Sequence, residues 1–443
     1  MRYTLWPLAA GGGIVSAYAD FLAAKARRHH APGIDVDPAR IHASLHDWQS
    51  RIVVQALKRG RGAVFADTGM GKTRMQIEWA RLIAPSSLII APLSVARQTV
   101  RESAKIDADV RYVRHPSDVV PGTVSITNYE MADKFNPAQF DAVALDESSI
   151  LKNFTGATRT ALIEQWANTP YRSSWSATPA PNDVTELCNQ AEFLGVMPRN
   201  EMLAAYFVHD DEGWRLKGHA ADPMFAWMAT WATAARRPSD VGGDDGPYHL
   251  PPLEIIPITV PVEIDQDGQL FATDLGGVGG RAQVRRSTLA ARVEASTSIL
   301  SLRGQWIAWC GLNDEADAIT KATDGAVNVH GGMTPDEKAD AFERFQDGDI
   351  RVLVTKPSIA GMGMNFQNCH RMVFCGMSDS WESYYQAVRR CWRFGQESPV
   401  EAYVVVSELE QQIVDNVRRK ETEVARWVDR LVWHMNHTQE KSA

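Results

Sequence analysis

The sequence predicts an α/β protein with two parallel-sheet lobes in tandem, a mainly helical insertion between them and a C-terminal helix. Short β-rich runs alternate with helical patterns over residues 45–195, and the same alternation returns over 301–407. A repeated strand–helix–strand order is typical of a parallel sheet covered by helices on both faces. The length of 443 residues is ample for two such lobes, since one domain takes roughly 150 residues.

The first lobe is expected over residues 45–195, after an N-terminal extension of residues 1–44. Its strands are predicted from short runs of β-branched and apolar residues that end in small or polar residues. In chain order these runs are 63–67, 87–92, 124–128, 142–147 and 173–179.

Residues 196–300 differ in composition and are expected to form an insertion and a connector. A Gly- and Pro-rich stretch at 238–252 marks the connector. The segment has aromatic residues at Trp214, Phe225, Trp227 and Trp231. One interpretation is stacking along DNA; we favour packing of Phe225, Trp227 and Trp231 within a small helical subdomain. Its basic residues are candidate contacts to phosphate, namely Arg215, Lys217, Arg236 and Arg237.

The second lobe is predicted over 301–407, and a closing helix and tail over 408–443. Strands are expected at 305–310, 326–330, 351–356, 371–376 and 401–407. After residue 407, apolar residues recur at mostly helical spacing up to Met435, which predicts one long amphipathic helix.

Composition narrows the class of protein. There are 46 basic and 54 acidic residues, so the formal net charge is −8, and any nucleic-acid site must be a local groove. The five cysteines form no C-x-x-C pair, which argues against a disulfide framework or a zinc ribbon and favours a reducing compartment. Pro7 and three glycines interrupt the first apolar run, so no signal peptide is expected. We expect a cytoplasmic protein that has no membrane partner and is a monomer in isolation.

The strongest motif is ADTGMGKT at 66–73, between a β run and a helix. A glycine-rich turn at a helix N-terminus points main-chain N–H groups at phosphate. Lys72 is placed to reach the β- and γ-phosphates, and the Thr73 hydroxyl to bind magnesium. Ala66 stands where the general phosphate-loop pattern has its first glycine.

Two further motifs complete a divided site. VALDESS at 143–149 places Asp146 and Glu147 at the carboxyl end of a strand, where ligands of α/β folds collect. We expect Asp146 to hold magnesium through water and Glu147 to orient and deprotonate the attacking water. In QAVRRCWRFGQ at 386–396, Arg390 and Arg393 share a helix face and are expected to approach the γ-phosphate when the lobes close.

Together these motifs carry a family resemblance over residues 45–407. The chain resembles superfamily-two helicases, and within them the Swi/Snf-like branch of double-stranded DNA translocases, related to the DEAD/DEAH-box enzymes. The segment 214–240 is similar to one in phage and prophage members. The motifs, in family order, are LHDWQ (45–49), ADTGMGKT (66–73), IIAPLSV (89–95), LDESSILKN (145–153), SATPAPN (176–182), TKPSIAGMGMNFQ (355–367) and QAVRRCWRFGQ (386–396).

The resemblance implies two RecA-like lobes and a role for each matching position. It implies that Gln49 reads the adenine and that the nucleotide phosphates are bound by Thr68, Gly69, Met70, Gly71, Lys72 and Thr73. The metal would be bound by Thr73 and Asp146, and the catalytic residues would be Glu147, Gln386, Arg390 and Arg393. Ser176 and Thr178 would act in coupling, and the nucleic-acid backbone would be contacted by Gly361, Gly363 and Asn365. Ser149 departs from the pattern, because the family often has histidine there, and coupling through that residue is in doubt.

The function expected from these residues is an ATP-dependent DNA translocase or helicase that uses ATP and Mg²⁺ and moves along DNA, with duplex favoured. Two alternatives stay open. One is a helicase that separates strands of DNA or RNA. The other is a nucleotide-gated nucleic-acid-binding subunit, with a protein partner, in a larger defence, modification or replication complex.

Overall fold

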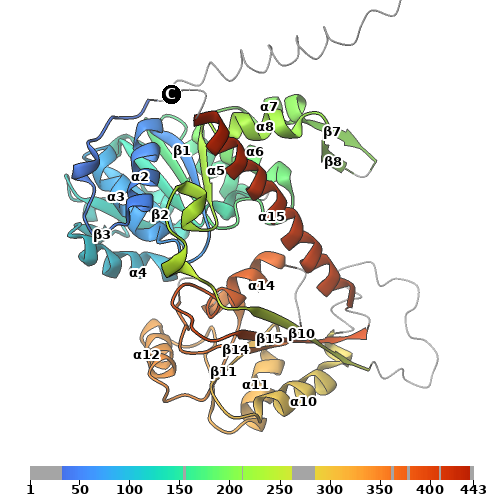
Figure 1. Cartoon of the computed structure of the whole chain (residues 1–443). Helices are drawn as coiled ribbons and strands as arrows, with labels where there is room; N and C mark the ends of the chain where they lie inside the picture. Colours follow the sequence, from blue (N-terminus) through green and yellow to red (C-terminus); the bar gives the residue numbers. More distant parts are fainter. Residues whose placement is uncertain are drawn as a thin grey trace, which may run out of the picture.

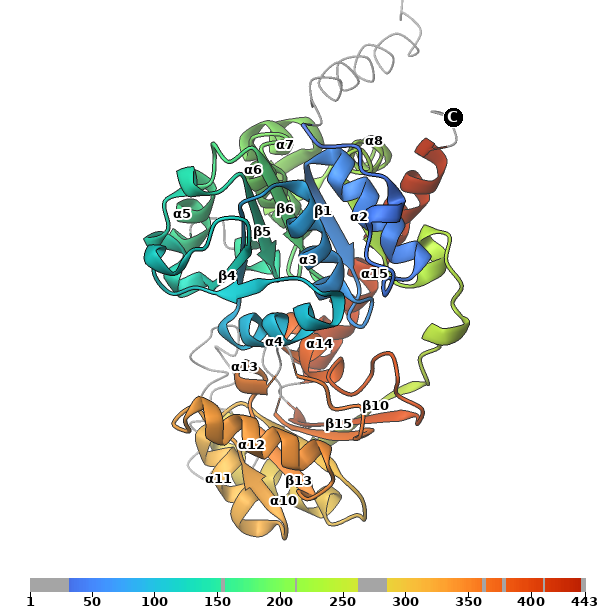
Figure 2. The ribbon, with the colours of Figure 1, turned by 90° about the vertical axis from the view of Figure 1, so that its left-hand side faces the viewer.

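The computed structural model describes residues 32–152, 156–211, 213–261, 285–360, 364–376, 380–408 and 411–439. Two lobes lie one above the other, and each is built on its own parallel sheet (Figures 1 and 2). The predicted fold class of two parallel-sheet α/β lobes in tandem is therefore confirmed. In the described ranges, no helix is both long enough and apolar enough to cross a membrane.

The first sheet has seven strands in the order β3-β4-β2-β5-β6-β1-β9, and all its pairs are parallel. Alternate residues of β1 face opposite sides, so Ala63 and Phe65 enter one core and Val64 and Ala66 the other. Because both faces are covered, the strands read as continuous apolar runs. The strands are β1 (Arg61–Ala66), β2 (Ser87–Ala91), β3 (Val110–Tyr112), β4 (Val124–Asn128), β5 (Ala142–Asp146), β6 (Tyr171–Trp175) and β9 (Ala232–Ala235).

Helices cover both faces of this sheet. One face packs against α2 (Asp47–Arg59), α3 (Lys72–Ile83) and α4 (Leu93–Ser103), and Figure 2 shows α2 and α3 in front of β1. The other face packs against α5 (Ala157–Gln165), α6 (Leu187–Leu194), α7 (Arg199–Tyr206) and α8 (Ala221–Met228). A hairpin of β7 (Phe207–Asp210) and β8 (Gly213–Leu216) projects from this side (Figure 1).

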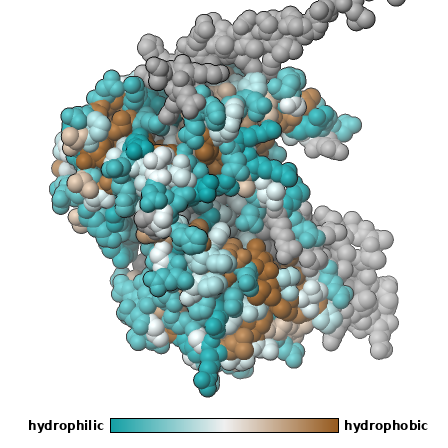
Figure 3. Space-filling view, in the orientation of Figure 1, coloured by the Kyte–Doolittle hydropathy of each residue, from teal (hydrophilic) through white to brown (hydrophobic). Residues whose placement is uncertain are grey.

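The second sheet has six strands in the order β10-β15-β14-β11-β13-β12, again all parallel. Its strands are β10 (Leu253–Val260), β11 (Trp306–Cys310), β12 (Ala326–Asn328), β13 (Val352–Thr355), β14 (Arg371–Cys375) and β15 (Val400–Ser407). Its helices are α10 (Leu289–Leu300), α11 (Asn313–Ala322), α12 (Pro335–Gln346), α13 (Pro357–Ala360) and α14 (Trp381–Val388). Apolar side chains gather over β10 and β15 on the face shown in Figure 3.

The described parts of residues 196–300 are divided between the two lobes, whereas the sequence predicted an insertion and connector between boundaries at 195 and 301. β9 extends the first sheet beside β1, while β10 pairs with β15 and α10 packs on the second lobe. The sequence signal was weak for physical reasons. β9 reads ATAA, without bulky β-branched residues, and β10 contains Pro257, which a sheet tolerates at its edge.

The three aromatic residues expected to pack within a small subdomain are part of the first lobe instead. Phe225, Trp227 and Trp231 are buried in the core of the first lobe, whereas Trp214 on the hairpin is 38% exposed. The basic residues all have protein partners: Arg215 pairs with Asp210, Lys217 donates to the Ala204 and Ala205 carbonyls, Arg236 pairs with Asp429, and Arg237 lies near Asp240 and Asp245.

The closing helix α15 (Gln411–Gln439) connects the two lobes. The helix follows the last strand of the second lobe. Its first turns pack on that lobe through the buried Val414, and its later turns pack on the first lobe through Trp427, Val428 and Leu431. Met435 Sδ accepts a hydrogen bond from the Ala234 N–H on the edge strand β9 at 3.0 Å. The helix therefore covers the edge of the first sheet (Figure 1).

Candidate active site at the junction of the lobes

The turn between β1 and α3 has the geometry of a phosphate loop. Gly69 and Gly71 have φ angles of +86° and +76°, a region that glycine adopts without steric cost. Gly71 is the N-cap of α3, and the helix begins at Lys72. The Lys72 ammonium donates to the main-chain oxygens of Ala66 at 2.8 Å and Asp67 at 3.2 Å. The structure thus places Thr68, Gly69, Met70, Gly71, Lys72 and Thr73 in one strand–turn–helix.

Gln49 lies against this loop although it comes from α2. It is buried, and its side-chain amide donates to the Met70 carbonyl at 3.0 Å, while its Oε1 accepts from the His46 N–H at 3.0 Å. These bonds fix the amide beside the loop, where the resemblance expects the adenine reader.

The acidic pair lies at the end of β5. Burial and then the charge of Glu147 raise the pKa of Asp146 to about 7, against the opposing charge of Lys72. Burial lowers the pKa of Lys72, and the charges of Glu147, Asp67 and Asp146 oppose that shift. Glu147 has a φ of +51°, which is unusual for a residue with a side chain. Such strain is typical of functional positions.

The arginines of the second lobe face this loop and the acids. Arg390 donates to the Gln386 carbonyl at 2.9 Å, to Gln386 Oε1 at 3.0 Å and to the Met364 carbonyl at 3.1 Å. Burial lowers the pKa of Arg390, and the charge of Glu147 opposes this shift across the lobes. Burial, followed by the charges of Arg390 and Arg389, lowers the pKa of Arg393 to about 10.

The backbone confirms that the two lobes meet here. A Cβ built on Gly69 would lie 3.4 Å from the Phe394 nitrogen and 4.0 Å from the Arg393 Cβ. The segment that follows α14 therefore lies directly beside the phosphate loop. The arginines do not lie on a remote surface, which is the arrangement that would have contradicted a divided site.

Ser176 and Thr178 follow β6, and Thr178 also reaches the second lobe. Ser176 Oγ accepts from the Thr178 N–H at 3.0 Å, and the Thr178 hydroxyl donates to Glu382 Oε1 at 3.4 Å. Lys152, from the segment after the acidic pair, forms an ion pair with Glu382. Of the two residues expected to act in coupling, Thr178 thus contacts a helix of the second lobe, through the Glu382 carboxylate that sequence reasoning missed, and Ser176 contacts Thr178.

The nucleic-acid residues are only partly placed. Gly361 and Gly363 lie outside the described residues. Asn365 is described, and its side-chain oxygen accepts a hydrogen bond from Arg393. This contact joins a predicted nucleic-acid residue to a predicted catalytic arginine.

The donor set at the cleft fits a nucleotide with magnesium. Four buried atoms of these residues have no hydrogen-bond partner among the described residues: Glu147 Oε2, Arg389 Nε, Arg389 Nη1 and Arg393 Nε. No group of three or more His, Cys, Asp or Glu side chains forms a metal cage in the part of the chain described. Magnesium in nucleotide sites commonly takes one or two protein ligands and completes its shell with phosphate and water. Thr73 and Asp146 are the residues that would hold it.

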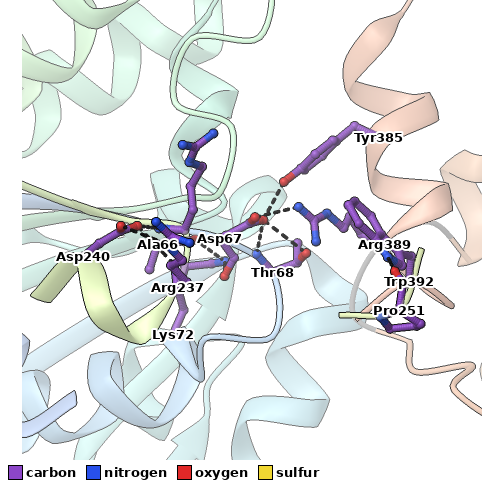
Figure 4. Close-up of polar contacts among 11 residues, drawn as sticks. Ala66, Asp67, Thr68, Lys72, Arg237, Asp240, Pro251, Tyr385, Arg389 and Trp392 are labelled. Carbon is purple, nitrogen blue, oxygen red and sulfur yellow. Dashed lines mark hydrogen bonds and ion pairs between the residues drawn. The ribbon is translucent and has the colours of Figure 1, made fainter. Parts of the chain in front are cut away.

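Sequence reasoning also missed Asp67, Tyr385 and Arg389. The Tyr385 hydroxyl donates to Asp67 Oδ1 at 2.5 Å, and Arg389 Nη2 donates to Asp67 Oδ2 at 2.6 Å (Figure 4). Both aromatic and basic partners come from α14 or its C-cap, within or just before the motif at 386–396. The spacing of 382, 385 and 389 on one helix face was the available signal.

Comparison with known proteins finds a family match in the second lobe. Residues 293–395 match the helicase conserved C-terminal domain. The chain is 33% identical over 70 residues to DEAD-box ATP-dependent RNA helicase 56 of Oryza sativa subsp. japonica, a match that covers 16% of each protein. It is 28% identical over 120 residues to Protein CHROMATIN REMODELING 20 of Arabidopsis thaliana, covering 26% of this chain and 8% of that protein.

A third relative is DNA repair protein rad8 of Schizosaccharomyces pombe, 29% identical over 108 residues, with 24% of this chain and 10% of that protein covered. The chain thus spans 8–16% of the length of these three relatives. Among solved structures, the Sulfolobus solfataricus SWI2/SNF2 ATPase core in complex with dsDNA matches with a TM-score of 0.43 and 16% identity, over 89% of this chain and 99% of that chain.

Proposed function

We propose that the protein is a nucleic-acid-dependent ATPase of the Swi/Snf-like type, which hydrolyses ATP between its lobes and moves along DNA, with duplex favoured. The single observation that carries the proposal is the meeting of the two half-sites. Lys72, Asp146 and Glu147 come from the first lobe, and Arg390 and Arg393 lie beside the same loop from the second. The helicase C-terminal match supports the assignment of the second lobe. That the chain is of the phage or prophage type stays a prediction.

The proposed function gives each of these residues a role. The phosphate loop and Lys72 bind the β- and γ-phosphates, and Gln49 reads the adenine edge. Asp146 and Thr73 would hold magnesium, which would neutralise charge on the phosphates. Glu147 Oε2, which has no partner among the described residues, accepts a proton from the attacking water. Arg390 and Arg393, oriented by Gln386 and Asn365, stabilise the charge that develops on the γ-phosphate.

Coupling to movement follows from the division of the site. Productive hydrolysis requires both lobes, so nucleotide binding favours closure and product release favours opening. Glu382 of the second lobe contacts Thr178 and Lys152, so movement of the lobes would shift the segment after β6 and the segment after the acidic motif.

The test is ATP hydrolysis measured in parallel with duplex DNA, single-stranded DNA and RNA. We expect the greatest stimulation by duplex DNA. Lys72→Ala and Glu147→Gln should abolish turnover, and hydrolysis at the parent rate in either variant would refute the assignment. Arg393→Ala should bind nucleotide but lose turnover by about 10³-fold or more. The exposed Arg344→Ala on α12 is the matched control and should hydrolyse ATP normally.

Two assays separate the alternatives. Triplex displacement without fork unwinding supports a translocase, whereas unwinding of forks supports a strand-separating helicase. Binding to DNA in a salt series should show a log–log slope of about 0.9 per phosphate neutralised. A flat dependence would contradict backbone tracking, and ATPase activity that appears only with a protein partner would favour the binding-subunit alternative.

A further inference from the structure

One face of α14 is docked on the first lobe. Glu382, Tyr385 and Arg389 are three and four positions apart, so they lie on the same side of the helix. Glu382 contacts Lys152 and Thr178 at one end of the helix, and the other two residues contact Asp67 at the other end. The helix is thus held to the first lobe at two places about two turns apart.

Asp67 is the partner that belongs to the phosphate loop itself. Its Oδ1 accepts from the Tyr385 hydroxyl and from the Thr68 N–H at 2.6 Å, while its Oδ2 accepts from Arg389. Its main-chain oxygen accepts from the Lys72 ammonium at 3.2 Å. Asp67 therefore contacts the phosphate-binding lysine through its backbone and the second lobe through its carboxylate (Figure 4).

The Arg389–Asp67 pair is enclosed, which distinguishes it from an ordinary surface pair. The exposed fractions of the two side chains are 8% and 9%. The guanidinium lies over the Trp392 ring at 4.3 Å and over the Tyr385 ring at 5.1 Å, and the Trp392 indole is itself held by a hydrogen bond to the Pro251 carbonyl at 2.7 Å. An arginine packed against two rings and paired with a carboxylate is restricted in orientation, so the position of its charge is set before any ligand binds.

Arg389 also adjoins the residues proposed to act on phosphate. It is the C-cap of α14, and Arg390 follows it directly, in contact with Gln386 on the same helix. Holding Arg389 on Asp67 fixes the end of α14 relative to the phosphate loop. The turn that carries Arg390 and Arg393 is then fixed as well, because it continues from the same helix end.

We propose that Asp67 and Arg389 are positioning residues, whose ion pair holds the C-terminal end of α14 on the phosphate loop and so places Arg390 and Arg393 at the γ-phosphate. This inference rests on the proposed function and adds two residues to it. Tyr385 and Trp392 support the pair by orienting its carboxylate and its guanidinium.

The pair predicts a particular kinetic pattern. Asp67→Asn and Arg389→Gln should each lower kcat by about 10-fold or more, because a small misplacement of catalytic groups is costly. The ATP KM should stay within about 3-fold, since Lys72, the glycines of the loop and Gln49 are unchanged. The kcat of the double variant should be no more than about 2-fold lower than that of the less active single variant, because both changes remove the same interaction. Arg389→Lys keeps the charge and should recover part of the loss.

The matched control is Arg111→Gln, which removes an exposed Arg–Asp pair on β3 of the first lobe, with Asp109 as its partner. This variant should retain the parental kcat and KM. A double variant whose loss equals the product of the single losses would contradict the coupling, and so would a rise in KM with kcat unchanged.

A distance measurement tests the inference without ATP hydrolysis. All five native cysteines are buried, so spin labels on Ser117→Cys and Lys321→Cys, one exposed position in each lobe, report the separation of the lobes. We expect one narrow distance distribution in the otherwise unchanged labelled protein, and a broader distribution at longer distance after Asp67→Asn or Arg389→Gln. The Arg111→Gln control should not change it.

The outcomes separate the two claims. Unchanged distances in both variants would overturn the positioning role, whatever the kinetics. If the unchanged protein hydrolyses no ATP with any nucleic acid, the proposed function fails, whereas a distance change confined to the Asp67 and Arg389 variants would still show that the pair holds the lobes.

Discussion

The side-chain amide of Gln49 lies in the space that the missing side chain of Gly71 leaves free. A Cβ built on Gly71 would be 2.4 Å from Gln49 Nε2, and the φ angle of Gly71 is +76°. Gly71 therefore provides both a left-handed turn and room for the amide that donates to the Met70 carbonyl. The glycine-rich loop and the proposed adenine reader depend on each other.

This relationship predicts two separable effects of Gly71→Ala. The strained φ should lower the free energy of unfolding by about 1–2 kcal/mol, and the methyl group should displace the Gln49 amide. We expect the ratio of kcat/KM for ATP to that for GTP to fall toward unity. Urea unfolding gives the first effect, and hydrolysis of the two nucleotides gives the second.

Gly122→Ala is the matched control. Gly122 has a φ of +81°, but no atom lies within 4 Å of a Cβ built there. This variant should show a similar loss of stability and no change in nucleotide preference. A loss of ATP preference in the Gly122 variant, or its retention in the Gly71 variant, would contradict the role given to Gln49.

A buried ion pair in the second lobe makes a prediction about stability. Arg292 and Glu315 are both fully buried and pair at 2.6 Å, and Glu315 also accepts from the Gly311 and Leu312 N–H groups at 2.8 and 2.9 Å. Arg292→Met leaves a buried carboxylate without its charge partner, so the free energy of unfolding should fall by about 3–5 kcal/mol. Denaturant unfolding measures this.

The comparison variant is Arg419→Met, which removes an arginine of the same kind of pair at the surface. Arg419 and Glu423 pair at 2.8 Å, but their side chains are 58% and 51% exposed. Its cost should stay below about 1 kcal/mol. Equal losses in the Arg292 and Arg419 variants would show that burial does not set the cost here.

Local chemistry explains which parts of the fold and of the site were predictable. The phosphate loop and the acidic pair each consist of residues close together in the sequence, and their residue types indicate the local backbone geometry. Gly69 and Gly71, for example, both have positive φ angles. Strands with both faces buried, such as β2 and β5, read as apolar runs. These features were predicted from the sequence, and the strands were confirmed.

What was missed depends on contacts between distant residues. The Asp67–Arg389 pair joins positions 322 apart in the sequence. The motif at 386–396 contains three arginines, and its sequence does not indicate which of them contacts a carboxylate of the first lobe. β9 was missed because ATAA has little strand propensity of its own and is ordered by pairing with β1. Tertiary contact, and not local preference, decides both.

Glu186 predicts a dependence of stability on pH. Burial raises the pKa of Glu186 to about 7, although its hydrogen bonds from Asn182 act in the opposite direction. Above the ordinary value of 4.5 the folded state holds a proton that the unfolded state has lost. The stabilisation is therefore complete below pH 4.5 and is lost as the pH rises through about 7. The slope contributed by this group is at most about 1.4 kcal/mol per pH unit.

Glu186→Gln should flatten this decline. Urea unfolding of the parent and the variant, followed from acid to neutral pH, measures the difference between the two slopes. Glu343→Gln, an exposed glutamate on α12, serves as the control and should keep the parental slope. Parallel curves for the parent and Glu186→Gln would rule out Glu186 as the titrating group.

The last helix predicts a link between the C-terminal part of the chain and the stability of the first lobe. Leu431 on α15 is fully buried in the core of the first lobe, among residues of α6 and α8. Leu431→Ala should lower the free energy of unfolding by about 2–5 kcal/mol, because it removes buried methyl groups and leaves a cavity. Trp433→Ala, two residues further on, removes a larger side chain that is 54% exposed, and should cost less.

Hydrogen exchange should show faster opening of β9 in the Leu431 variant, since the same helix covers that edge strand through Met435. If the Leu431 change accelerated exchange only in the second lobe, α15 would belong energetically to the lobe it follows in sequence and not to the lobe on which it packs.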